Sequence, residues 1–123
     1  MKSTAIILCI ALLLSIRCAA AQSDRPAPYR PISGEFAIYS GELDDQQAPT
    51  EKDRKLSLIV TGQAAKEVFQ AIGHDDKQTC DGAKGSRSRS RGNVWCTFHP
   101  GEGYTCYFGI DLRTGKSIPG GIC

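Results

Sequence analysis

The sequence predicts a small α+β domain in which an antiparallel β-meander of about five strands carries one short helix, in the order β-β-α-β-β-β. Three observations predict this fold. Residues 94–98 and 104–110 place apolar or cysteine side chains at every second position on either side of a short turn. Residues 65–72 instead carry apolar side chains at helical spacing. Four cysteines in the C-terminal half allow two disulfides in a chain with room for one modest core.

The N-terminus predicts a cleavable signal peptide over residues 1–21. A basic residue precedes the apolar run Ala5–Ile16, which is shorter than the about 20 residues that a membrane-spanning helix needs. Three alanines then form a small-residue cleavage site that ends at Ala21. We therefore expect a secreted or periplasmic protein whose mature chain begins at Gln22.

Removal of the signal peptide changes the cysteine and charge balance. Cys9 and Cys18 leave with it, and Arg17 before Cys18 is unlike the small or aliphatic residue that precedes a lipidated cysteine. Loss of Lys2 and Arg17 leaves thirteen basic residues against thirteen acidic ones. A neutral mature chain gives no reason to expect nucleic-acid binding.

The first half of the mature chain predicts a flexible segment followed by two strands. Residues 22–32 are rich in proline and predict a flexible N-terminal segment, after which one domain spans residues 33–123. Alternating side chains predict strands over 35–40 and 55–61. The polar stretch 41–54 between them predicts a long loop with a net charge of −3 over residues 42–54.

A helix and a hairpin follow in the second half. The apolar spacing predicts a helix over residues 65–72 that ends at Gly73 and packs on the sheet. Residues 74–92 have almost no apolar side chains, which predicts a second long loop. A five-residue turn over 99–103 then sets the register of the hairpin. The predicted pairs are Phe98 with Tyr104, Cys96 with Cys106, Val94 with Phe108, and Trp95 with Tyr107.

The end of the chain predicts a last strand at an edge of the sheet. Residues 113–115 have the composition of a three-residue hairpin loop, which would set Ile110 opposite Ile118. Pro119 has no N–H to donate to a ladder, so this strand belongs at an edge.

The cysteines Cys80, Cys96, Cys106 and Cys123 predict two disulfides and no bound metal or cofactor. Directly opposed cysteines on neighbouring strands make strained bridges, so the pairing Cys80–Cys96 with Cys106–Cys123 is favoured over the two other pairings. Cys96 and His99 have the spacing of a zinc-ligand pair, but no second close pair accompanies them.

Two features are candidate binding surfaces. The first is the basic stretch of the second loop, which could bind a carboxylate, phosphate or sulfate group, or could be a solvated loop that the fold does not need. Its members are Lys84, Arg87, Arg89 and Arg91. The second is the pair Trp95 and Tyr107. We expect the helix to cover this pair and make it core, because one helix must cover one face of the sheet; without that cover the pair forms an apolar patch beside the basic stretch.

A catalytic interpretation depends on the two histidines. His99 lies in the predicted turn with Glu102, and with nearby arginines this pair would suit general acid–base cleavage of RNA. His74, Asp75 and Asp76 lie in a polar loop, where such residues are commonly exposed. No motif places a nucleophile or a base, so we do not expect an enzyme.

These observations favour a small exported binding module of the bacterial periplasm or exterior, of the inhibitor or immunity type. Its expected partner is another protein or an anionic component of the envelope. The alternatives are a small secreted nuclease or other hydrolase that uses His99 and Glu102 with loop arginines, and an envelope structural or stress protein without a discrete site.

Overall fold

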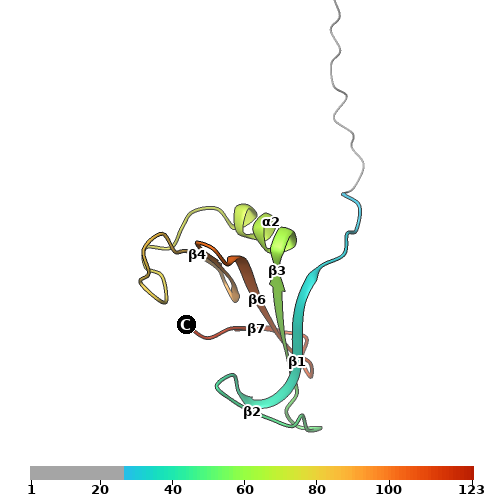
Figure 1. Cartoon of the computed structure of the whole chain (residues 1–123). Coiled ribbons are helices and arrows are strands. Elements are labelled where there is room, and N and C mark those ends of the chain that lie inside the picture. The colour runs from blue at the N-terminus through green and yellow to red at the C-terminus, as the bar shows by residue number, and fades with distance from the viewer. Residues whose placement is uncertain (1–26) are drawn as a thin grey trace, which may run out of the picture.

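The computed structural model describes residues 27–123 of the chain. The predicted signal peptide, residues 1–21, lies outside the described residues, as do residues 22–26 of the proline-rich segment. In the described part, one antiparallel sheet carries one helix on one of its faces (Figure 1). The α+β class predicted from the sequence is confirmed.

The sheet has the strand order β2-β1-β3-β6-β5-β4, and the short β7 pairs with β6. Its strands are β1 (Ser33–Glu42), β2 (Asp45–Gln47), β3 (Lys55–Thr61), β4 (Arg87–Arg91), β5 (Val94–His99), β6 (Gly103–Asp111) and β7 (Ser117–Ile118). Two of these strands lie in stretches that the sequence predicts as loops. β2 forms a hairpin with the end of β1, and β4 pairs along β5. Both strands are polar, so apolar alternation did not reveal them.

The helix α2 (Gly62–Ile72) follows β3 directly and lies across one face of the sheet (Figure 1). Ala65 and Phe69 point inward from it and are fully buried. They pack with Val60, Cys96 and Cys106, and these five residues form the core. We call the side of the sheet that α2 covers the helix face. We call the opposite side the strap face, because the C-terminal tail, residues 119–123, crosses that side.

The predicted register of β5 and β6 is confirmed. Cys96 lies opposite Cys106, Phe98 opposite Tyr104, and Trp95 opposite Tyr107. The register of the last hairpin is wrong by one residue, because Ile118 lies opposite Gly109 rather than Ile110. The loop is longer than predicted: the N–H of Asp111 donates to the carbonyl of Lys116, which leaves four residues between them.

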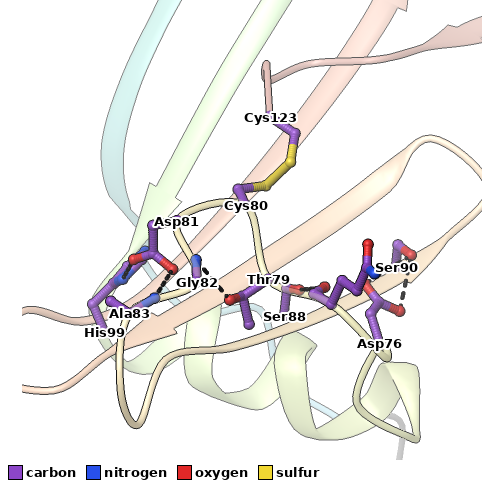
Figure 2. Close-up of a disulfide and its surroundings, with 11 residues drawn as sticks. Asp76, Thr79, Cys80, Asp81, Gly82, Ala83, Ser88, Ser90, His99 and Cys123 are labelled. Carbon is purple, nitrogen blue, oxygen red and sulfur yellow. Dashed lines mark hydrogen bonds and ion pairs between the residues drawn. A yellow bond between two sulfur atoms is a disulfide. The ribbon is translucent and has the colours of Figure 1, made fainter.

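The described part of the chain contains two disulfides, but not in the predicted pairing. Cys96 bonds to Cys106, and Cys80 bonds to Cys123. The first pair is directly opposed on neighbouring strands with Cα atoms 4.0 Å apart, near the about 4.5 Å of the closer type of antiparallel pair. The second forms because the chain after β7 crosses the strap face and reaches the loop that follows α2 (Figure 2).

The disulfides are compatible with an extracellular or periplasmic protein, because oxidising compartments allow them to persist. Among the helices of residues 27–123, none is long and apolar enough to cross a membrane. One bridge lies within the β5–β6 hairpin, and the other joins the loop after α2 to the C-terminus.

Candidate functional site

The predicted basic loop is largely a strand whose arginines contact the helix. The guanidinium of Arg89 lies 4.3 Å from the ring centroid of Phe69 and donates to the Phe69 carbonyl oxygen at 3.0 Å. The guanidinium of Arg87 lies 5.2 Å from the same ring. Arg91 donates to the carbonyl oxygen of Ile72 at 3.2 Å. The alternation of β4 thus places all three arginines beside α2.

These arginines complete the C-terminal end of α2. The last carbonyl groups of a helix lack partners within it and favour a positive charge nearby. The last turn of α2 has no basic residue of its own, so β4 supplies the charge. Asp75, just after the helix, accepts hydrogen bonds from Arg87 at 2.8 Å and from Arg89 at 2.7 Å. The interpretation of Arg87–Arg91 as a solvated loop that the fold does not need is therefore wrong.

Arg89→Ala is expected to lower the free energy of unfolding by about 1–3 kcal/mol, because a charged hydrogen bond and the packing against Phe69 are lost together. The side chain of Arg89 is only 15% exposed, so water does not replace these contacts freely. Lys84→Ala is the matched control, because Lys84 is exposed and its loss should change the free energy by less than about 0.5 kcal/mol. Equal urea midpoints for the two variants would contradict the structural role of Arg89.

The Asp75 carboxylate should make stability depend on pH. Hydrogen bonds from Arg87 and then Arg89 lower the pKa of Asp75 from 3.8 to about 2. A carboxyl whose pKa is lower in the folded state stabilises the fold above its unfolded pKa, and this contribution is lost as the pH falls from 3.8 toward about 2. The stability difference between wild type and Asp75→Asn should therefore shrink over that range in parallel denaturation curves. A constant difference would show that Asp75 does not titrate as an ion-paired group.

Trp95 and Tyr107 lie on the strap face, where their rings stack with centroids 4.7 Å apart. The helix covers the other face, so the expectation that it covers this pair is wrong. The C-terminal tail instead packs on Tyr107: a side chain at Gly121 would meet the Tyr107 ring at 2.7 Å. The tail is fixed where Ser57 donates to the Gly120 carbonyl oxygen at 2.8 Å. Trp95 also lines a hollow of about 320 Å³ beside the tail, with Ser88, Ser90, Pro119 and Cys123.

The structure does not assemble the predicted acid–base site. His99 contacts Asp81 and Ser86 through the same ring nitrogen, Nδ1, at 3.1 Å in each case (Figure 2 shows the Asp81 contact). A nucleophile–base–acid relay needs the serine and the aspartate on different nitrogens of the imidazole. The arginines that would accompany His99 lie by the helix, whereas β5 and β4 place His99 and Ser86 on the strap face. The backbone N–H of Glu102 donates to the His99 carbonyl oxygen, and no hydrogen bond of the Glu102 side chain is present within residues 27–123.

The described surface has one large group of exposed apolar side chains on the sheet. Phe36 and Ile38 of β1 are 71% and 48% exposed. They lie opposite Leu58 and Leu56 of β3, and Leu56 in turn lies opposite Ile110 of β6, which is also exposed. Directly opposed residues share a face of the sheet. We call Phe36, Ile38, Leu56 and Ile110 the open apolar face.

The open apolar face is uncovered because α2 is too short for the sheet. A helix of 11 residues is about 16 Å long, whereas six strands span about 24 Å between the outer two. The helix packs on β3, β4, β5 and β6, and Phe36, Ile38, Leu56 and Ile110 lie outside the cluster that it buries. The alternation of side chains in the sequence correctly predicted that these residues lie in strands. It did not predict how much of the sheet α2 covers.

Comparisons of the chain with protein-family models, with curated proteins and with solved structures give no match.

Proposed function

We propose that this protein is a small exported binding module that holds another protein through its open apolar face. The observation that carries the proposal is the exposure of Phe36 and Ile38 next to Leu56 and Ile110 on one face of the sheet. Contiguous apolar surface that a domain leaves uncovered is typical of a protein-interaction site. Export is supported by the predicted signal peptide together with two disulfides.

The other candidate surfaces support binding less well. The guanidinium groups of Arg87 and Arg89 both donate hydrogen bonds to Asp75, and Arg89 also donates to the Phe69 carbonyl oxygen. These groups are therefore less available to a partner. Trp95 and Tyr107 stack on each other beneath the tail. The open apolar face, in contrast, rests on three paired strands of a sheet whose core contains a disulfide. A rigid surface of this kind loses little conformational entropy on binding, as suits an inhibitor or immunity-type protein.

A photo-crosslinking amino acid at position 36 tests the proposal directly. The protein with this residue in place of Phe36 is expressed in its own host and irradiated, and the adducts are identified by mass spectrometry. The matched control carries the same residue in place of Tyr29, which is exposed but lies outside the open apolar face. We expect a defined protein adduct from position 36 and none of the same mass from position 29.

A folded but binding-deficient variant completes the test. Phe36→Asp should lower the free energy of unfolding by no more than about 1 kcal/mol, because the side chain is largely exposed and mainly the strand preference of phenylalanine over aspartate is lost. It should weaken capture of the crosslinked partner by at least tenfold, as expected when an anchor residue of an interface is lost. Identical adducts from positions 36 and 29, or undiminished capture by Phe36→Asp, would refute the proposed function.

A further inference from the structure

Among the residues that the structure describes, the outer edge of β1 is unpaired along most of the strand. Ser33 to Tyr39 pair with β3 on one side, whereas β2 covers only Ser40–Glu42 at the end of the strand. Figure 1 shows β1 at the margin of the sheet, with β2 at its curled end. Within residues 27–123, no strand pairs with the outer edge of Ser33–Tyr39. An edge of this length with exposed apolar side chains is a template for another strand.

The opposite margin of the sheet is protected, which makes the free edge of β1 distinctive. The N–H of Asp76 donates to the carbonyl oxygen of Ser88 on β4 at 2.8 Å. Ser88 and Ser90 also bond to the same loop, at the Gln78 carbonyl oxygen and the Asp76 carboxylate (Figure 2). The loop after α2 therefore lies along β4, and β1 has no equivalent cover in the described chain.

The charge around the free edge identifies the kind of strand that fits. Residues 33–51 contain five acidic side chains and no lysine or arginine. All five are exposed: Glu35 lies on the free edge itself, and the others follow at or beyond the end of β1 that pairs with β2, namely Glu42, Asp44, Asp45 and Glu51. A partner segment with basic residues would gain electrostatic attraction here, and alternating apolar residues would rest on the open apolar face.

We infer that the outer edge of β1 accepts an extended segment of a partner protein, with alternating apolar and basic residues, as an added strand. This inference rests on the proposed function and names how the partner is held: main-chain hydrogen bonds along Ser33–Tyr39, apolar side chains beside Phe36 and Ile38, and basic side chains near the acidic ones. A second copy of the chain fits less well, because its own β1 has no lysine or arginine to offer and carries Glu35 and Glu42 instead.

Short peptides test this inference with the intact protein. The probe is a nine-residue peptide that alternates valine and lysine, and its control replaces every lysine by glutamate. We expect the lysine peptide to bind at least tenfold more tightly, with an affinity that falls as salt screens the acidic side chains. In hydrogen exchange, every second amide within residues 34–38, those that point away from β3, should gain protection when this peptide binds.

Backbone methylation separates strand addition from simple contact with the apolar face. Two versions of the lysine peptide are N-methylated, one at the valines and one at the lysines, which removes the donors of one edge at a time. At least one version should lose tenfold or more in affinity. If both bind like the parent, or if the parent does not bind, strand addition is refuted, while partner adducts from position 36 still support the proposed function. Self-association of the protein that Phe36→Asp abolishes would overturn the inference in favour of a second copy.

Discussion

Phe69→Ala is expected to lower the free energy of unfolding by about 3–5 kcal/mol, the range for removing a buried aromatic side chain. Phe69 is 1% exposed and lies at the centre of the domain, where its ring meets the edge of Tyr104 at a centroid distance of 5.2 Å. The guanidinium groups of Arg87 and Arg89 lie over the same ring. One substitution thus opens a cavity and removes the surface on which β4 packs against α2.

Urea denaturation followed by Trp95 fluorescence measures this loss. Phe69→Leu is the matched control, because it retains most of the apolar volume and should cost clearly less than Phe69→Ala. The double variant Phe69→Ala/Arg89→Ala should be less destabilised than the sum of the single variants, since the two side chains are in contact. If the two losses of unfolding free energy simply add, the contact between Arg89 and the Phe69 ring does not contribute to stability.

Removal of the Cys80–Cys123 bridge by the double change to serine is expected to cost about 3–5 kcal/mol. The bridge closes a loop with a sequence separation of 43, and closed loops of about 15 to 100 residues restrict the unfolded chain by about 3–4.7 kcal/mol. The change also frees the C-terminal tail, so Trp95 and Tyr107 lose their cover.

Two measurements check the expected loss. Thermal unfolding without reductant should show a lower midpoint for the double variant, and fluorescence quenching should show a more accessible Trp95 in the native state. The single variant Cys80→Ser, which also breaks the bridge, should be destabilised to a similar degree and leave Cys123 open to thiol labelling. A Cys123 thiol that resists labelling in that variant would contradict a tail held by this bridge.

The sequence reveals parts of this fold that depend on neighbours along the chain. Alternation on both sides of the 99–103 turn gave the correct register of β5 and β6, because turn length and apolar pattern restrict each other. Helical spacing and Gly73 gave the correct end of α2, although the helix begins at Gly62, three residues before the predicted start. β2 and β4 are polar, and the sheet rather than their composition makes them strands.

The disulfides and the candidate site depend on contacts across the fold, which sequence spacing does not report. The predicted register already placed Cys96 beside Cys106, and an expectation of strain led to the wrong pairing. The arginines of β4 look like a binding surface in sequence, but Phe69, Ile72 and Asp75 meet them in space. Phe36 and Ile38 read as ordinary strand residues, because the length of α2 relative to the sheet decides whether they are covered.

The affinity of the partner crosslinked at position 36 for the double variant Phe36→Asp/Ile110→Asp tests the central claim most directly. The two residues lie on β1 and β6, at opposite sides of the open apolar face, and both are exposed. If this face binds the partner, the double variant loses a hundredfold or more in affinity under conditions where it is folded, although its urea midpoint falls because Ile110 is only 39% exposed. An unchanged affinity of the folded double variant would contradict the claim that the protein acts through this face.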